Sequence, residues 1–513
     1  MRERVGNMSE MYDLVVIGAG PGGYESALEA ARLGLKTAIV EKDAVGGTCL
    51  NRGCIPTKTL MHSSDLCAQI RGASRFGIGA GEPSVDMEAV QRHKDATVQT
   101  LQKGILSLFK TRRVTLYQGF GTVLPPDSAS AGAGETAQIS DGAGQCPPAG
   151  ESPAQEPQGV FRVKVTAADK EETLLEARRI LLATGSVPSR PPIPGLDLPG
   201  VMTSDELLSY GGAPFESLLI IGGGVIGIEF AGIYQNFGTK ITIVEALPSL
   251  LANMDRELGQ SLKLSLKKKG ADIHTSASVQ RLERNPDGSI STVFLEKEKE
   301  CAVTADAVLV AVGRRPYTAG AFAEDYAPAM ERGRVVVDET YQTSVPGIYA
   351  IGDVNGQIQL AHAAAAQGKR AVRTIALQLG KPAASGEEGA SCAAKEEPLL
   401  IPSCVYTDPE IACVGMTQEE AKAQGIPTKS HKILSSANGK SVLSLQERGF
   451  IKVVYREDTH VILGAQLMCA RATDMVSEFA VAIRQKMTME QLSDVVRPHP
   501  TFSEMITEAA SID

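Results

Sequence analysis

Residues 46–58 read GGTCLNRGCIPTK and are the most informative stretch of the sequence. It contains two cysteines, Cys49 and Cys54, and the run to Met61 is predicted to be helical. On a regular helix, residues five apart have Cα atoms about 8.7 Å apart, since the rise is roughly 1.5 Å and the radius about 2.3 Å. A disulfide requires less than about 7 Å. A bridge therefore needs a distorted helix, which Gly53 and Pro56 would permit, and a strained bridge is easily reduced.

Two buried free thiols are the alternative interpretation of this cysteine pair, because thiols stay reduced in a reducing compartment. The sequence before the pair supports a redox role. A strand at 12–17, a glycine-rich turn, a helix and a second strand form a dinucleotide-binding fingerprint. Gly18 makes the tight turn, Gly20 lets the backbone approach a pyrophosphate, and Gly23 permits close helix packing. Glu41 ends the second strand and is suited to a ribose hydroxyl.

A second complete fingerprint follows the strand predicted at 218–221. Its glycines are Gly222, Gly224 and Gly227, and Glu245 ends the next strand. Two fingerprints in one chain imply two dinucleotides. Because Glu245 would repel the 2′-phosphate of NADP and no arginine follows nearby to receive one, the second site is predicted to bind NAD.

Composition excludes several classes of protein. The net charge of −9 without a basic stripe argues against nucleic-acid binding. Nine cysteines in 513 residues are too sparse for a secreted disulfide scaffold. No apolar run reaches the roughly 20 residues of a membrane span, and the first ten residues lack the apolar core of a signal peptide. We therefore expect a cytoplasmic protein without a nucleic-acid partner, a membrane partner or a metal site.

The stretch 46–58 resembles the redox signature of the flavin-dependent pyridine nucleotide-disulfide oxidoreductases, most closely the dihydrolipoamide dehydrogenase group. The two cysteines, the flanking glycines, the Ile-Pro pair and the lysine all match, and the resemblance covers nearly the whole chain. It implies FAD at the first fingerprint, NAD at the second and a homodimer. Near the C-terminus, HPTFSE resembles the family's His-Pro-Thr-x-x-Glu dyad. The implied catalytic residues are Cys49, Cys54, His499 and Glu504. Thr501 to Glu504 also reads as a capping box, which is compatible with that role.

The resemblance also implies further cofactor-binding residues. Lys58 and Glu229 match a lysine–glutamate pair near the flavin, although an ordinary surface ion pair is the alternative. The stretch 347–353, GIYAIGD, resembles the family's second FAD signature. The other candidates lie at the ends of apolar strands or near these signatures: Thr184, Gly185, Gly313, Gly352, Asp353 and Ala361.

The predicted fold class is α/β, with two Rossmann-like dinucleotide-binding domains and a C-terminal α+β dimerisation domain. Two Pro-, Gly-, Ala- or Ser-rich stretches, 125–159 and 380–398, depart from the family and are predicted to be mobile insertions. The predicted domains are an FAD-binding domain at 11–194, an NAD-binding domain at 195–317, a segment returning to the FAD domain at 318–398 and the dimerisation domain at 399–513.

The implied function is oxidation of protein-bound dihydrolipoamide through Cys49, Cys54 and FAD, with reduction of NAD⁺ to NADH. The expected partners are lipoyl domains or a lipoyl carrier protein of a multienzyme complex. One alternative is a glutathione-reductase-like enzyme of the same fold, against which Glu245 argues because that enzyme prefers NADP. Another is a non-catalytic assembly subunit of a 2-oxoacid dehydrogenase or glycine cleavage complex, against which the intact catalytic residues argue.

Overall fold

The computed structural model describes residues 10–125, 159–381, 397–446 and 448–512. Nearly all of both predicted insertions, 125–159 and 380–398, lies outside the described residues. The chain divides into two compact units. The first consists of Met1–Asn51, Gln99–Val187 and Arg315–Glu397, and the second of Arg52–Val98, Pro188–Arg314 and Pro398–Asp513. The four domain ranges expected from the sequence remain predictions.

A seven-stranded sheet forms the centre of the first unit. Its order is β3-β2-β1-β6-β5-β4, with β19 also paired to β6. The strands are β1 (Met11–Ile17), β2 (Thr37–Glu41), β3 (Thr115–Gln118), β4 (Phe120–Leu124), β5 (Phe161–Thr166), β6 (Glu172–Leu182) and β19 (Ile348–Ala350). The strands β1, β2 and β3 are parallel, and β1 and β19 run parallel to β6, whereas β4, β5 and β6 form an antiparallel meander. Gly119, which has a φ of 156°, separates β3 from β4.

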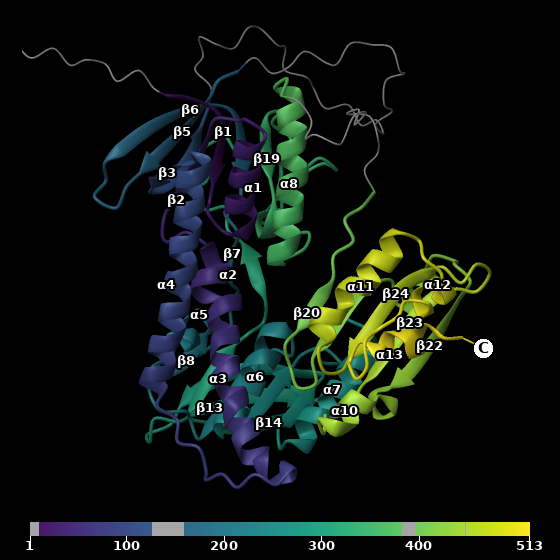
Figure 1. Cartoon of the computed structure of the whole chain (residues 1–513). Coiled ribbons are helices and arrows are strands. Elements are labelled where there is room, and N and C mark those ends of the chain that lie inside the picture. Colours follow the sequence, from purple (N-terminus) through teal and green to yellow (C-terminus); the bar gives the residue numbers. More distant parts are fainter. Residues whose placement is uncertain (1–9, 126–158, 382–396, 447, 513) are drawn as a thin grey trace, which may run out of the picture. The chain divides into compact units, whose positions relative to one another are not determined.

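Two helices of the first unit pack side by side, α1 (Pro21–Arg32) and α8 (Ala361–Gln378) (Figure 1). Small residues permit this close contact, because a Cβ on Gly368 would lie only 2.0 Å from Ser26 Oγ. The other elements of this part are α2 (Gly47–Arg52), β17 (Met330–Glu331), β18 (Arg334–Val335) and η2 (Gly352–Asn355). The chain passes between the units at the last residue of α2, Arg52, and within three further elements: α4 (Met87–Arg112), β7 (Ser186–Pro188) and β16 (Arg314–Pro316).

The second unit contains a parallel sheet in the order β11-β10-β9-β15-β8. Its strands are β8 (Val201–Thr203), β9 (Ser217–Ile221), β10 (Lys240–Glu245), β11 (Asp272–Thr275) and β15 (Ala307–Val310). Its helices are α3 (Cys54–Gly72), η1 (Ala73–Phe76), α5 (Ser204–Leu208), α6 (Val225–Phe237) and α7 (Arg256–Lys268). An antiparallel sheet is formed by β12 (Ala277–Arg284), β13 (Ile290–Glu296) and β14 (Lys299–Ala305).

An antiparallel sheet dominates the C-terminal part of the second unit, in the order β20-β21-β24-β23-β22. Its strands are β20 (Ser403–Val405), β21 (Ile411–Gly415), β22 (Thr428–Leu434), β23 (Phe450–Arg456) and β24 (Ile462–Met468). The strands β23 and β24 form an antiparallel ladder. The helical elements are α9 (Gln418–Ala423), η3 (Ser435–Ala437), α10 (Gly439–Leu443), α11 (Ala472–Arg484), α12 (Met489–Ser493) and α13 (Glu504–Ala510).

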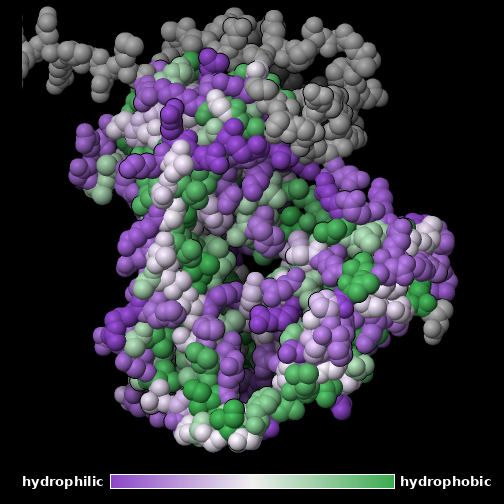
Figure 2. Space-filling model, in the orientation of Figure 1, coloured by the Kyte–Doolittle hydropathy of each residue, from purple (hydrophilic) through white to green (hydrophobic). Residues whose placement is uncertain are grey.

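The face drawn in Figure 2 mixes hydrophilic and hydrophobic residues, and the hydrophobic ones lie in scattered groups. Within the part of the chain that the structure describes, no helix is long and apolar enough to cross a membrane. Among the same described residues, no cluster of histidine, cysteine and carboxylate side chains is suited to a metal ion.

Candidate active site

The cysteine pair lies on two successive helices. Cys49 is half-buried in α2, and Cys54 is the exposed first residue of α3. The residue between the helices, Gly53, has φ −147° and ψ −117°, and its carbonyl accepts hydrogen bonds from the Thr57 amide and hydroxyl. The predicted distortion between the two cysteines is therefore present at Gly53. Because Cys54 lies at a helix N-terminus, the helix dipole favours its thiolate.

Asn51, which the sequence analysis did not single out, holds α2 in place. Its Nδ2 donates to the carbonyls of Ala44, Val45 and Gly47 at 3.0, 3.2 and 2.9 Å. Its Oδ1 accepts a hydrogen bond from Gln102 Nε2 at 2.6 Å. An asparagine inside a short cysteine-containing helix is the signal that could have indicated this clamp, since its side chain readily bonds to nearby backbone groups.

The two glycine fingerprints have the same local structure. Gly18 and Gly222 have φ of 100° and 112°, and a Cβ on either would lie 2.4 Å from the carbonyl oxygen of Ala183 or Ala311. A Cβ on the third glycine of each set would lie 1.9 or 2.3 Å from the carbonyl oxygen of the first. The tight turns and the close helix packing predicted for these positions are therefore present.

The acids that end β2 and β10 bind their glycine loops in the same way. Glu41 Oε2 accepts a hydrogen bond from Ala19 N at 2.7 Å, and Oε1 accepts one from Asp43 N at 2.8 Å. At the equivalent positions, Glu245 Oε2 accepts from Gly223 N and Oε1 from Leu247 N at 2.6 Å. Each carboxylate thus orients the turn beside the second glycine of its fingerprint.

Space for a ligand lies at the second glycine of each fingerprint. A Cβ on Gly20 would have only the Cα of Gly47 within 4 Å, at 3.9 Å, and a Cβ on Gly224 would have no neighbour within 4 Å. Packing does not require glycine at either position. The open space at both positions would fit the approach of a pyrophosphate to the backbone.

The candidates near the second FAD signature are joined by hydrogen bonds. Asp353 lies inside η2 and accepts from Ser186 Oγ, whereas the N-cap of η2 is Ile351. Gly352 N donates to Gln367 Oε1 at 2.7 Å. Ser186 and Gln367 are further polar residues here that the sequence analysis did not identify. Three other candidates lie at strand ends or a helix start: Thr184, Gly313 and Ala361, which is the first residue of α8. The Thr184 hydroxyl donates a hydrogen bond to Tyr317 O at 2.6 Å. Gly185 has a φ of 72°, and a Cβ there would meet open space.

Lys58 and Glu229 form an ion pair at 2.7 Å between Nζ and Oε2. The Glu229 side chain is only 5% exposed and that of Lys58 30%, so the pair is not an ordinary surface ion pair. The other carboxylate oxygen, Oε1, accepts a hydrogen bond from Tyr406 N at 3.1 Å. The Lys58 ammonium also lies 4.4 Å from the centre of the Tyr406 ring. Tyr406 is a further residue that the sequence analysis missed.

His499 and Glu504 form the predicted dyad, with 2.8 Å between Nδ1 and Oε1. The Thr501 amide donates to the second Glu504 oxygen at 2.8 Å, and this bond, followed by the His499 contact, holds the pKa of the carboxyl below its usual value. The His499 side chain is 79% exposed. The predicted capping box is only half formed, because α13 begins at Glu504 with Ser503 as its N-cap.

Two models of one known protein family match most of the chain. Residues 12–368 match the pyridine nucleotide-disulphide oxidoreductase family model, and residues 401–510 match the dimerisation domain of the same family. The chain is 36% identical to a dihydrolipoyl dehydrogenase of Bacillus subtilis, with 98% of each chain covered. It is 35% identical to that of Geobacillus stearothermophilus, over 99% of this chain and 97% of the other.

Two solved structures are also similar. LpdA from Mycobacterium tuberculosis has a TM-score of 0.80 and 25% identity, with 97% of this chain and 98% of the other covered. The HOCl-induced flavoprotein disulfide reductase RclA from Escherichia coli has a TM-score of 0.77 and 26% identity, with 97% and 99% covered.

Proposed function

Because the chain belongs to the pyridine nucleotide-disulphide oxidoreductase family, we propose that it is a dihydrolipoyl dehydrogenase, which oxidises dihydrolipoamide and reduces NAD⁺. Family membership confirms the predicted family, fold class and enzyme class, and FAD and NAD are the cofactors that this family uses. The main support for the proposal is the exposed His499 ring, which is hydrogen-bonded to Glu504. The same chain places Cys54 at the start of a helix.

The first proposed step is attack on the Cys49–Cys54 disulfide. His499 takes the proton of one dihydrolipoyl thiol, and the resulting thiolate attacks Cys49 Sγ. A substrate–Cys49 disulfide forms, and the S–S bond between the cysteines breaks to leave a thiolate at Cys54. The start of α3 stabilises that negative charge.

The second proposed step releases the product. The remaining substrate thiol attacks the substrate sulfur bound to Cys49, which closes the lipoyl disulfide and breaks the bond to Cys49. Its proton goes to the departing Cys49 sulfur, which is released as a thiol. FAD, when bound, would supply the two-electron chemistry that links the cysteine pair to NAD⁺, and Cys49 and Cys54 would return to their disulfide. Glu504 keeps its negative charge through these steps, because its hydrogen bonds lower its pKa, and it stabilises His499 when that ring is protonated.

Cofactor binding is assigned to the glycine loops and their neighbours. We propose that Gly18, Gly20, Gly23 and Glu41 hold the FAD pyrophosphate and ribose, and that Gly222, Gly224, Gly227 and Glu245 hold NAD. Around them, the proposed contributors are Lys58, Thr184, Gly185, Glu229, Gly313, Gly352, Asp353 and Ala361.

The match to the dimerisation domain supports a homodimer. We propose that the electron donor is a lipoyl group on a lipoyl domain or carrier protein of a multienzyme complex, and that the protein works in the cytoplasm. Nine cysteines in 513 residues are consistent with a reducing compartment.

Steady-state kinetics test the proposal. Purified flavin-loaded protein is assayed with dihydrolipoamide and NAD⁺, and in parallel with glutathione disulfide and NADPH. The proposal requires turnover of the first pair at a kcat/KM at least about 100-fold above the second, a difference of roughly 2.7 kcal/mol. Turnover of glutathione disulfide would favour the glutathione-reductase-like alternative, and no turnover of either would favour an assembly subunit.

A further inference from the structure

Tyr406 contacts both members of the Lys58–Glu229 pair. Its backbone N–H donates to Glu229 Oε1 at 3.1 Å, and the centre of its ring lies 4.4 Å from Lys58 Nζ. Glu229 in turn binds Lys58 through its other oxygen at 2.7 Å. The three residues therefore form a closed triangle in which the ammonium is held by a carboxylate on one side and by an aromatic ring on the other.

The residues of this triangle come from three distant segments that share one buried core. Lys58 lies on α3, Glu229 on α6, and Tyr406 directly follows β20. A near neighbour of each belongs to the same hydrophobic cluster: Leu60, Phe230 and Val405. Because core packing fixes the three backbones, the ring and the carboxylate are pre-organised for the lysine.

The position of Lys58 on its helix gives the triangle its chemical importance. Lys58 follows Cys54 by four residues on α3, so the two side chains lie on the same helix face. A nearby cation lowers the pKa of a thiol and so favours its thiolate. Because a lysine side chain is long and flexible, its ammonium favours the thiolate only if other groups keep it close to the sulfur.

The electrostatic surroundings of Tyr406 agree with this arrangement. Burial raises the pKa of the phenol to about 12, and the charges of Cys404, Glu229, Glu410 and Cys54 act in the same direction. Tyr406 is thus close enough to Cys54 for its charge to be felt. Lys58 is the cation that the structure places among these groups through its contacts with Glu229 and the Tyr406 ring.

We propose that Tyr406 is a positioning residue, whose ring face and backbone N–H hold Lys58 and Glu229 so that the ammonium stays beside Cys54. The ring attracts the cation through its quadrupole, and the hydroxyl is not needed for this. The inference rests on the proposed function at one point only, which is that the proposed reaction forms a thiolate at Cys54.

Alkylation of Cys54 tests this proposal without turnover. The reduced protein is treated with iodoacetamide between about pH 5 and pH 9, and modification of the Cys54 peptide is followed by mass spectrometry, because the thiolate is the reacting form. In Tyr406→Leu we expect the apparent pKa of Cys54 to rise by about one unit, which slows alkylation about tenfold on the acid side. Tyr406→Phe, which keeps the ring face, should titrate like the parent protein.

Two further variants define the cause. Lys58→Met should raise the Cys54 pKa at least as far as Tyr406→Leu does, because it removes the charge itself. Tyr326→Leu changes a partly buried tyrosine of the other unit and should leave the profile unchanged. If Tyr406→Leu lowers the melting temperature too far for titration, Tyr406→Met takes its place, since it retains volume without a ring.

Three results would overturn the proposal. The first is a parental profile in Tyr406→Leu or Tyr406→Met, and the second is an equal shift in Tyr406→Phe, which would assign the effect to the hydroxyl. The third is a parental profile in Lys58→Met, which would show that the ammonium does not act on Cys54. Failure of the parent protein to oxidise dihydrolipoamide would instead defeat the proposed function and leave the alkylation result intact.

Discussion

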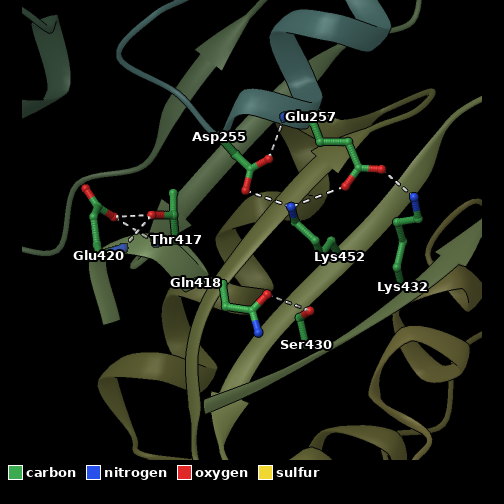
Figure 3. Close-up of polar contacts among 8 residues, drawn as sticks. All are labelled: Asp255, Glu257, Thr417, Gln418, Glu420, Ser430, Lys432 and Lys452. Atoms are coloured by element: carbon green, nitrogen blue, oxygen red, sulfur yellow. Dashed lines mark hydrogen bonds and ion pairs between the residues drawn. The ribbon is translucent and has the colours of Figure 1, made fainter. Parts of the chain in front are cut away.

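Lys452 Nζ lies 2.7 Å from Asp255 Oδ2, and both side chains are almost fully buried, at 12% and 2% exposed (Figure 3). Asp255 is also the N-cap of α7, because its Oδ1 accepts a hydrogen bond from Glu257 N at 2.9 Å. Glu257 continues the network to Lys452 at 3.3 Å and to Lys432 (Figure 3). One lysine of β23 thus fixes the first turn of α7 to the C-terminal sheet.

Removing that lysine should strongly destabilise the protein. Lys452→Met leaves the Asp255 carboxylate buried without its cation, which is expected to lower the free energy of unfolding by about 3–5 kcal/mol. Urea denaturation followed by circular dichroism measures the loss. The double variant Lys452→Met/Asp255→Asn is the matched control, because asparagine keeps the N-cap without the charge, and it should recover part of the loss. A loss below about 1 kcal/mol in the single variant would contradict the expectation.

Asp65 should make stability depend on pH. Burial, followed by the charge of Asp408, raises the pKa of this carboxyl to about 6 from its usual 3.8, and Asn236 Nδ2 donates to it at 3.0 Å. The folded state therefore binds more protons between about pH 4 and pH 6, so this group lowers stability as the pH rises through that window. Asp65→Asn should be more stable than the parent above about pH 6, by at most about 3 kcal/mol.

The measurement for Asp65 is urea denaturation at about pH 8 and at about pH 4. The difference between variant and parent should be present at the higher pH and disappear at the lower one, where the parent carboxyl is also protonated. An advantage of the same size at both values would show that the carboxylate charge is not its source.

Glu245 should determine the choice of nicotinamide cofactor. The parent protein is expected to prefer NAD over NADP by about 100-fold in kcat/KM, because the carboxylate would accept from a ribose hydroxyl and would repel a 2′-phosphate. Glu245→Gln should reduce this ratio while keeping one acceptor for the loop. Glu41→Gln is the matched control, since Glu41 makes the same contacts in the first loop. An equal change in the ratio in both variants would refute the assignment.

Each active site is predicted to use two chains. His499 lies in the region that matches the dimerisation domain, and the family resemblance implies that it serves the cysteines of the partner chain. Cys49→Ser and His499→Gln proteins are mixed by unfolding and reassembly. About half of the dimers should be mixed, each with one intact site, so about a quarter of parental activity should return. Activity no higher than the sum of the two mutants, with mixed dimers confirmed by mass, would mean that His499 serves its own chain.

Local patterns allowed accurate prediction of several elements. The strands expected at 12–17 and 218–221 correspond to β1 and β9 within one residue, since a short apolar run followed by a glycine turn is a local feature of the sequence. A break between the cysteines was expected only if they form a disulfide, because a regular helix holds their Cα atoms too far apart. The Tyr406 and Lys452 contacts could not be predicted, because each joins segments more than 170 residues apart. The start of α13 was placed wrongly, since Thr501 uses its hydroxyl on Pro498 O and Ser503 rather than on the helix.

The matched hydrogen bonds of Glu41 and Glu245 have a consequence for how ligand choice is encoded. The two loops have the same turn, the same acid and equivalent backbone donors, so they present the same groups to a dinucleotide. The loops by themselves therefore do not distinguish a flavin from a nicotinamide dinucleotide. The difference lies in what stands next to them. Gly47 borders the space at Gly20, whereas the space at Gly224 has no neighbour within 4 Å. The two sites therefore differ in the residues that surround the loops and not in the loops themselves.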